Sequence, residues 1–509
     1  MQRCLRFPGE ERAEEEKSKK GEVVLTSEPS YTPSGARTAS SNCDQCLASS
    51  QKKALFTCPK CQFLRYCSKD CERKASDIHR FECPALKRMA PDYPSESVRL
   101  LARLIFILRN GGEKKVEKFS EKEGRKFRDL MNHYSDIKVR KDYMKDVEKM
   151  MSDLKTYIGE SFLPNESDFL GIYGRVMVNR FCLHDEELGM VGSGLYLAAS
   201  IFDHACIPNC SFSFEGTKVV IRALTDMDDF SFNKCRISYL DPLQGTKERR
   251  EELYKFWFFW CDCKPCHDEE RLSMENTIKC ENEHCLSPVM VPEDDASSTP
   301  PTCTRCGETV NPATLKKYNE IIAYTKKTMS IMSREENSKD YETCYDLLEK
   351  QGSVLSSMNI WRCRTLDFAF NAAINNGCFS LAFDYGDENK AAMRFYYGPD
   401  HPAYGVFLLH LAKAKFYNKE YKEGLEHIRE AEPILKVAYG ASHPLISEEL
   451  SRLTYIAYED VEFALARRLA MAQKGTKEDD PRVVRVSGRN EPLRLGNGEI
   501  FTAHAPTLL

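Results

Sequence analysis

Apolar residues recur at three- and four-residue intervals in two long stretches of the chain. Over residues 97–160 the pattern includes Val98, Leu101 and Leu108, and it returns over residues 311–474. An amphipathic helix buries one stripe of side chains at this spacing. The pattern therefore predicts a helical segment in the first part of the chain and an α-helical domain toward its end.

Between these stretches the pattern changes to short runs of β-branched residues separated by turn residues. Residues 190–242 mix Gly turns with runs such as Val219–Ile221, and a turn at Gly21 precedes a strand-like run that ends at Pro29. Runs bounded in this way by Gly, Pro and Ser are typical of strands. We therefore expect a multidomain α+β protein with a β-rich middle.

A six-residue motif is repeated within the second helical stretch. Tyr397-Gly-Pro-Asp-His-Pro402 and Tyr439-Gly-Ala-Ser-His-Pro444 begin 42 residues apart, the length of a helical hairpin with its loop. Stacked helix pairs are therefore expected, and they resemble tetratricopeptide hairpins. The motif fits a loop that ends a helix better than it fits a ligand site.

Composition and charge narrow the class of protein. The 73 Lys and Arg residues nearly balance the 77 Asp and Glu residues, which argues against a protein that coats nucleic acid. Residues 10–20 and 475–509 are rich in charge and are expected to be solvated and flexible. Neither a transmembrane helix nor a secretory signal is predicted, so we expect no membrane partner and a reducing compartment, cytoplasmic and nuclear.

Many of the 22 cysteines fall into clusters with the spacing of metal ligands. The first cluster offers seven Cys and one His: Cys43, Cys46, Cys58, Cys61, Cys67, Cys71, His79 and Cys83. A structural zinc site takes four nitrogen or sulfur ligands in a tetrahedron, and each short pair of ligands supplies two. Eight ligands therefore make two closed sites, and so short a segment needs the metal in order to fold.

This cluster resembles the MYND finger, including the run Leu64-Arg-Tyr-Cys-Ser68 and the closing pair His79 and Cys83. The resemblance implies that the ligand pairs interleave, whereas the spacing alone leaves the pairing open. One zinc would then take Cys43, Cys46, Cys67 and Cys71, and the other would take Cys58, Cys61, His79 and Cys83. MYND fingers bind proline-containing peptides, so the resemblance also implies such a partner here.

A second cluster offers only three ligands, Cys261, Cys263 and Cys266. A fourth has to come from elsewhere, and the candidate segment is Phe202-Asp-His-Ala-Cys-Ile-Pro-Asn-Cys210, which includes Asp203 to Asn209. Together with Ile237-Ser-Tyr-Leu-Asp241, these segments resemble a SET domain followed by its post-SET zinc site. The resemblance implies that Cys206 completes that site.

The order of these parts resembles the SMYD family of SET- and MYND-domain protein lysine methyltransferases over roughly residues 21–470. The implied fold is a β-rich SET core split by a MYND finger and a helical insert, followed by a post-SET zinc site and a tetratricopeptide-like helical domain. The expected parts are an N-terminal segment with the first SET strands (1–42), the finger (43–83), the insert (84–189), the SET core (190–242), the post-SET region (243–272), a zinc ribbon (273–310), the helical domain (311–474) and a tail (475–509).

The family resemblance also implies an activity and the residues that serve it. Such enzymes transfer a methyl group from S-adenosylmethionine to a lysine amine of a histone or another protein. Tyr239 would be the catalytic tyrosine, and Trp257 would line the lysine channel with it. The cofactor would be bound by His133, Asn179, Asp203, His204 and Phe259. Without the resemblance, Tyr239 could equally be a structural residue, a buried tyrosine in a strand with a hydrogen-bonded hydroxyl.

The chain departs from the family pattern at four places. Residues 12–20 lack the glycine turn that wraps the cofactor, and Asp203 stands where the family has Asn. The run Phe230–Cys235 replaces a Gly-Glu-Glu-Leu segment, and Trp257 replaces a tyrosine. Asp203 lacks the amide donor of Asn, although a carboxylate can be tolerated opposite a sulfonium. Because of these four changes, weak or absent catalysis remains an alternative for this chain.

A third cluster comprises Cys280, Cys285, Cys303 and Cys306. Two Cys pairs of this kind, the second followed by Gly307, are typical of a zinc ribbon. A structural role is expected, in which the ribbon braces the post-SET region against the helical domain. One zinc ion here would bring the total to four.

Three functions are compatible with the sequence of the whole chain. The first is a monomeric methyltransferase with a protein substrate. The second is a catalytically weak or inactive scaffold that recruits partners through the finger and the helical repeats, and the third is a corepressor whose methyl transfer is incidental. The lysine-rich residues 113–147 also permit a nucleic-acid contact, which no interleaved aromatic residues support.

Overall fold

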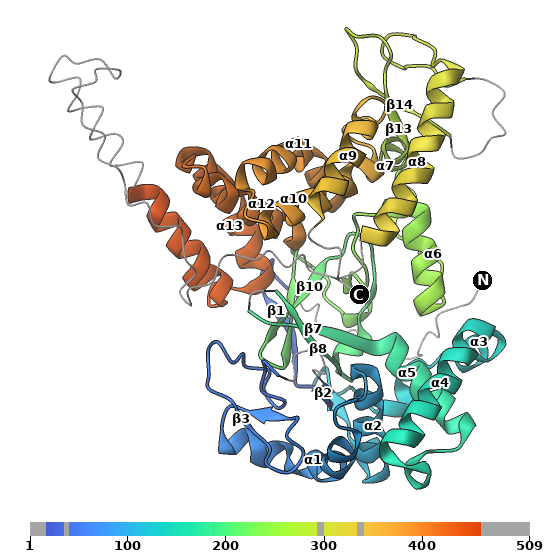
Figure 1. Ribbon diagram of the computed structural model, residues 1–509, viewed down its shortest axis with the longest axis vertical. Helices are drawn as coiled ribbons and strands as arrows, with labels where there is room; N and C mark the ends of the chain where they lie inside the picture. The colour runs from blue at the N-terminus through green and yellow to red at the C-terminus, as the bar shows by residue number, and fades with distance from the viewer. Residues whose placement is uncertain (1–16, 35–39, 187, 293–299, 333–339, 460–509) are drawn as a thin grey trace, which may run out of the picture.

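The computed structural model describes residues 17–34, 40–186, 188–292, 300–332 and 340–459 (Figure 1). The predicted flexible tail at 475–509 lies outside these ranges. Of the predicted flexible run at 10–20, the part up to residue 16 also lies outside them. Within the described ranges, no helix has both the length and the apolar character needed to cross a bilayer.

The centre of the molecule is built from small sheets whose strands come from distant parts of the chain. One antiparallel sheet has the order β1 (Val23–Ser27), β11 (Lys218–Ala223), β10 (Cys210–Glu215), and another has the order β2 (Tyr31–Ser34), β8 (Met190–Leu195), β7 (Arg180–His184). A short parallel pair joins β9 (Asp203–His204) to β12 (Arg236–Ile237). Leu25 of β1 lies opposite Ile221 of β11, and both are buried. The predicted N-terminal strand is therefore an integral part of the core.

The cysteine-rich finger packs against the first helices at one end of the molecule (Figure 1). The finger contains β3 (Phe56–Thr57), β4 (Arg65–Tyr66) and α1 (Lys69–Met89), which packs on α2 (Glu96–Arg109). The Ser68 hydroxyl caps α1 by accepting from the Cys71 N–H at 3.2 Å. The insert then continues through β5 (Glu117–Lys118), β6 (Gly124–Arg125), α3 (Tyr134–Val139), α4 (Lys141–Ile158) and α5 (Glu166–Asn179).

A buried network of charges joins the finger to the insert. The Arg99 Nε donates to Glu82 at 2.7 Å, and an Arg103 terminal nitrogen donates to Asp44 at 2.6 Å. All four side chains are at most 4% exposed. Burial by itself would raise the pKa of Glu82, but Arg103 and Arg99 outweigh it and hold that pKa well below its usual range. The carboxylate is therefore charged inside the fold.

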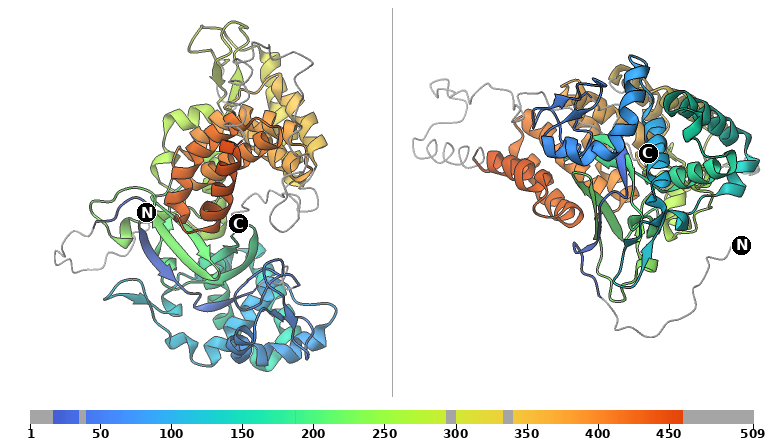
Figure 2. Two further views of the ribbon diagram at one scale, coloured as in Figure 1. Left: turned by 90° about the vertical axis from the view of Figure 1, so that its left-hand side faces the viewer. Right: turned by 90° about the horizontal axis from the view of Figure 1, so that it is seen from below.

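The helices of the C-terminal half form a second layer that covers the sheets from the other side (Figure 2). After α6 (Thr246–Trp257), α7 (Glu269–Glu275) and the ribbon hairpin β13 (Thr277–Lys279) and β14 (Pro288–Met290), the chain is helical. These later helices are α8 (Pro312–Met332), α9 (Tyr341–Gly352), α10 (Ile360–Asn375), α11 (Phe379–Tyr397), α12 (Pro402–Tyr417), α13 (Tyr421–Tyr439) and a final helical segment that begins with the π-helix Leu445–Leu450.

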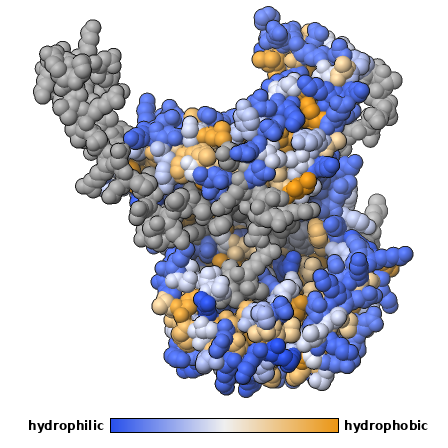
Figure 3. Space-filling view, in the orientation of Figure 1, coloured by the Kyte–Doolittle hydropathy of each residue, from blue (hydrophilic) through white to orange (hydrophobic). Residues whose placement is uncertain are grey.

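Large apolar side chains hold these helices together. α10 packs on α11 and α12 packs on α13, and their shared core includes Phe370 and Leu408, each at most 1% exposed. The stacked pairs match the arrangement that the repeated motif predicts. The outer face of this half is mainly hydrophilic, with scattered apolar side chains (Figure 3).

Candidate functional site

Among the residues that the structure describes, four groups of cysteine and histidine ligand atoms come together. Within each group all the ligand atoms lie within 4.8 Å of one another. The groups are Cys43, Cys46, Cys67 and Cys71; Cys58, Cys61, His79 and Cys83; Cys206, Cys261, Cys263 and Cys266; and Cys280, Cys285, Cys303 and Cys306. In the finger, the ligand pairs interleave in the way that the family resemblance implies.

The spacing of these atoms suits zinc. In a zinc tetrahedron with Zn–S bonds of about 2.3 Å, neighbouring sulfurs lie roughly 3.8 Å apart. The Cys46 and Cys67 sulfurs are 3.5 Å apart, and the Cys58 and Cys83 sulfurs are 3.9 Å apart. The fourth ligand of the second group approaches through the His79 Nε2, 3.3 Å from the Cys58 sulfur. The donor sets therefore fit four-coordinate structural zinc.

The third group joins the SET-like core to the segment after α6. The Cys206 sulfur follows β9 and lies 4.0 Å from that of Cys261 and 3.6 Å from that of Cys266. Because Cys206 comes from a segment 55 residues earlier in the chain, this cluster ties β9 to the end of α6. It therefore positions the aromatic residues that lie between them.

The fourth group lies at the far tip of the helical half. The Cys280 and Cys306 sulfurs are 3.4 Å apart, and Cys306 is exposed, unlike the ligands of the other groups. The ribbon is attached at its base, where the Asn359 amide donates to the Thr277 carbonyl at 3.0 Å. This contact fits the predicted role of the ribbon, which is to brace the post-SET region against the helical domain.

Tyr239 stands at the centre of a cluster of aromatic rings. Its ring centroid lies 5.4 Å from that of Trp257, 6.4 Å from that of Phe259 and 5.3 Å from that of His204. Trp257 ends α6 and Phe259 follows it, whereas His204 belongs to β9. The structure thus brings together residues that the sequence separates by more than fifty positions.

Hydrogen bonds fix Tyr239 on β9. Its hydroxyl donates to the Phe202 carbonyl at 2.7 Å, and its N–H donates to the His204 Nδ1 at 3.0 Å. The other nitrogen of His204 lies 3.4 Å from the Cys206 sulfur, so the tyrosine is linked through His204 to the third cysteine group. Desolvation, with a further contribution from the Asp203 carboxylate, raises the pKa of Tyr239. The hydroxyl is therefore protonated at neutral pH.

The remaining predicted cofactor residues adjoin this cluster. The Trp257 Nε1 donates to the Val178 carbonyl at 3.2 Å, and the next residue, Asn179, donates to the Met131 carbonyl at 2.9 Å. His133 stacks on Phe258 with ring centroids 4.7 Å apart. The insert thus meets the end of α6 through Val178 and His133.

Arg125 was missed by the sequence reasoning and lies in the same region. One of its terminal nitrogens donates to the Ser200 carbonyl and the other to the Asp129 carbonyl at 3.1 Å. The preceding Gly124 lets the hairpin close, because a Cβ there would lie 2.8 Å from the Glu117 carbonyl oxygen. No motif surrounds Arg125, so only the folded chain reveals its position.

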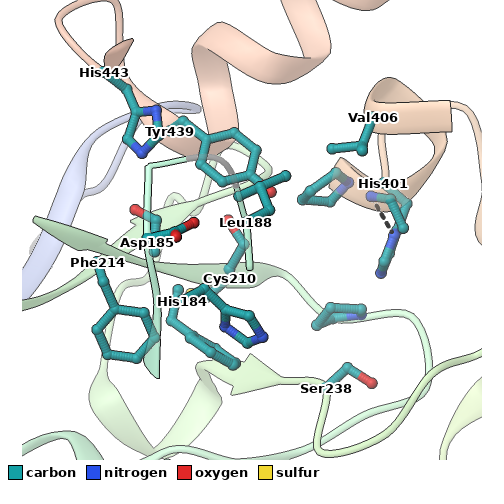
Figure 4. Close-up of a pocket in the computed structure, with 16 residues that line it drawn as sticks. His184, Asp185, Leu188, Cys210, Phe214, Ser238, His401, Val406, Tyr439 and His443 are labelled. Atoms are coloured by element: carbon teal, nitrogen blue, oxygen red, sulfur yellow. Dashed lines mark hydrogen bonds between the residues drawn. The ribbon is translucent and has the colours of Figure 1, made fainter. Parts of the chain in front are cut away.

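A cavity lies between the SET-like core and the helical half (Figure 4). Phe212 and Phe214 of β10 line one side, and His401 and His443 of the two repeated motifs line the other. Ser238, which precedes Tyr239, also lines it. The repeated motifs end α11 and α13 as predicted, and they also contribute to one cavity wall.

The two histidines that line this cavity are hydrogen-bonded in the same way. His401 accepts from the Ala403 N–H and His443 accepts from the Leu445 N–H, in both cases through Nδ1 at 3.2 Å. Burial lowers the pKa of His401 to about 4 and also lowers that of His443. Both rings are therefore neutral at physiological pH, with the proton on Nε2. The cavity combines apolar walls with N–H donors.

Comparisons with known proteins agree with this architecture. The MYND finger family model matches residues 43–83. The chain is 28% identical to the human histone-lysine N-methyltransferase SMYD3 over 435 residues, which cover 84% of this chain and 90% of that protein. It is 24% identical over 414 residues to the zebrafish N-lysine methyltransferase SMYD2-A, covering 80% of this chain and 86% of that protein. It is also 24% identical to the Arabidopsis thaliana histone-lysine N-methyltransferase ASHR1 over 445 residues, covering 85% and 90% respectively.

Proposed function

We propose, from the membership of this chain in the SMYD family of SET- and MYND-domain proteins, that it is a protein-lysine N-methyltransferase dependent on S-adenosylmethionine. The observation that carries the proposal is the position of Tyr239. The tyrosine lies in an aromatic cluster, is linked through His204 to the third cysteine group, and directly follows a residue that lines the cavity.

The aromatic cluster suits a lysine amine that has to act as a nucleophile. An ammonium cannot attack, and desolvation between aromatic rings lowers the pKa of an amine. Tyr239, Trp257 and Phe259 would form such walls, with the indole of Trp257 held by the Val178 carbonyl. The tyrosine hydroxyl, protonated at neutral pH, would orient the amine as a neutral polar group.

The cofactor would supply an activated methyl group. His133, Asn179, Asp203, His204 and Phe259 are the residues proposed to hold it, and the contacts that His133 makes with Phe258 and His204 with Phe259 support this assignment. The exposed carboxylate of Asp203 fits a cationic ligand in place of the amide expected in the family.

The cavity would receive the substrate segment, from a histone or another protein. The Nε2–H groups of His401 and His443 suit backbone carbonyl acceptors, and the rings of Phe212 and Phe214 suit apolar side chains. The finger would recruit proline-containing partners separately, because it lies on the other side of the sheets. Four zinc ions, two in the finger and one each in the post-SET site and the ribbon, would have structural roles.

Replacement of Tyr239 tests the proposed catalytic role. In Tyr239→Phe, methyl transfer from labelled S-adenosylmethionine to core histones and a lysine-containing peptide library should fall by roughly tenfold or more. The matched control is Tyr254→Phe, because the Tyr254 side chain is exposed and lies outside the cluster. Zinc content and melting temperature should stay close to the wild-type values. Unchanged transfer in Tyr239→Phe would show that the catalytic assignment is wrong.

A scaffold function is the second candidate, and one observation favours it. The Tyr239 hydroxyl already donates to the Phe202 carbonyl, as in a structural tyrosine. Calorimetry on the zinc-loaded protein separates the candidates. A scaffold would bind proline-rich peptides and lose that binding in Cys61→Ser, but it would show no heat on titration with S-adenosylmethionine, whereas the enzyme would bind the cofactor.

A further inference from the structure

The ribbon cluster is the most open of the four ligand groups in the part of the chain that the structure describes. Its Cys306 is exposed, whereas every ligand of the other three groups is buried or half-buried. In the post-SET group, for example, Cys206 and Cys266 are at most 2% exposed. A small reagent in the solvent can therefore reach a ligand sulfur of the ribbon without any opening of the fold.

Cys306 also has the surroundings of a reactive thiolate. Zinc ligands are deprotonated, and the thiolate is the form of cysteine that acts as a nucleophile. Arg305 precedes Cys306, and one of its terminal nitrogens donates to the Ser287 hydroxyl at 3.4 Å, so a positive charge lies in the same part of the ribbon. Reactive cysteines occur in exposed, electropositive surroundings of this kind.

The sulfur of Cys280 is in position to react with an oxidised Cys306. The two sulfurs are 3.4 Å apart, so a short approach would bring them to bonding distance. The two residues lie 26 positions apart in the chain, and a disulfide between them would join the two knuckles of the ribbon. The other two ligands, Cys285 and Cys303, would keep their thiols.

We propose that the ribbon cluster is a peroxide-sensitive site, in which oxidation of Cys306 and Cys280 to a disulfide expels the zinc. The Cys306 thiolate attacks hydrogen peroxide, breaks its O–O bond and becomes a sulfenic acid, with release of one hydroxide. The Cys280 thiolate then attacks the sulfenic sulfur, forms the disulfide and displaces a second hydroxide. The two sulfurs together lose two electrons, which the peroxide gains. The two remaining ligands are too few for a closed structural site.

Oxidation should disturb the ribbon rather than the whole protein. β13 remains bound to the helical domain, because the Lys279 N–H donates to the Val354 carbonyl at 2.9 Å. The second knuckle, Cys303–Cys306, lies just before α8 and would lose the ion that organises it. Hydrogen exchange should therefore increase over residues 300–311 and the first turn of α8, while residues 43–83 stay protected. This chemistry needs neither S-adenosylmethionine nor a protein substrate.

The order in which zinc leaves the full, zinc-loaded chain tests this chemistry. Hydrogen peroxide is added, and a zinc-binding dye follows release from the four ligand groups. The first equivalent should leave at least about tenfold faster than the others, because an exposed thiolate reacts before buried ones. Mass spectrometry of a non-reduced digest should then find Cys280 joined to Cys306. Dithiothreitol with added zinc should restore the site.

Two variants separate Cys306 from the other ligands. Cys306→His keeps a set of three Cys and one His, which holds structural zinc but cannot form this disulfide, so the fast release should slow by about tenfold or more. Cys378→Ser is the matched control, because Cys378 is a half-buried cysteine outside the four groups, and it should release zinc as the wild type does. Cys306→Asp, which also offers a zinc ligand, replaces Cys306→His if that variant does not retain the metal.

Three results would overturn the proposal. Alkylation of all four ribbon thiols in the zinc-loaded wild type would show that the ribbon holds no zinc. A first disulfide among residues 43–83 would show that the exposure of Cys306 does not set the order of release. Equal release rates in the wild type and Cys306→His would show that the Cys306 sulfur is not the one that peroxide oxidises.

Discussion

The finger and the C-terminal helical half both pack on the same central sheets, but their interiors differ in kind. The finger is organised around two groups of metal ligands and shares with α2 a network of four buried charges. The helical half has an interior of large apolar side chains, such as Phe370 and Leu408. Short segments cannot bury enough apolar surface to fold alone, whereas stacked helix pairs can.

This contrast predicts that stability in the two regions depends on different chemistry. Metal binding and charge pairing are all-or-none, because a cluster that loses one ligand, or a network that loses one charge, leaves buried polar groups without partners. An apolar core loses stability in proportion to the volume removed.

Removal of metal should affect the finger most strongly. Structural zinc contributes on the order of 10 kcal/mol to the folding of small zinc domains. In Cys61→Ser, or after chelation, hydrogen exchange should show loss of protection over residues 43–83, while α10–α13 remain protected. The control is Cys378→Ser, since Cys378 lies outside the four ligand groups. Equal loss of protection in both regions would contradict the contrast.

Removal of one charge from the buried network should have the next largest effect. Arg103→Met leaves Asp44 and Glu82 without a contact that each makes with Arg103 inside the fold. The expected loss is about 3–5 kcal/mol of unfolding free energy, measured by chemical denaturation. The matched control is Arg73→Met, because Arg73 pairs with Asp70 at the surface with 80% of its side chain exposed. That variant should change stability by less than about 1 kcal/mol.

The smallest expected effect is a stabilisation that depends on pH. Burial, followed by repulsion from Asp241, raises the pKa of Asp367 in α10 to about 7. A carboxyl whose folded-state pKa is raised favours the fold while it is protonated, and this advantage is lost as pH rises from about 4 to 7. Asp367→Asn should therefore increase the free energy of unfolding at pH 8 by roughly 1–2 kcal/mol, and the melting temperature should rise with it. At pH 5 the same substitution should change the melting temperature little.

The control for this last prediction is Asp384→Asn, on an exposed side chain of α11. It should give the same melting temperature as wild type at both pH values. A stabilisation by Asp367→Asn that is equal at pH 5 and pH 8 would show that the buried charge is not its cause.

The sequence by itself determined the parts that depend on local spacing. Short Cys pairs identify metal ligands because a tight turn can place two sulfurs on one ion, and helical periodicity identifies stacked helices because one stripe of each is buried. The repeated Tyr-Gly-x-x-His-Pro motif correctly predicted two helix ends, at Tyr397 and Tyr439. These features are local, so no knowledge of distant contacts was needed to find them.

Tertiary structure alone decided which distant residues meet. Spacing could not show that the finger pairs interleave, that Arg99 and Arg103 face inward on α2, or that both repeated motifs line one cavity. Nor could it show that Arg125 donates to the Ser200 carbonyl, two residues before the Phe202 carbonyl that accepts from Tyr239, because a lone Arg in a hairpin has no sequence signal of its own. Such contacts depend on chain segments that only folding brings together, and the charge of a side chain does not reveal its partner until the packing around it is known.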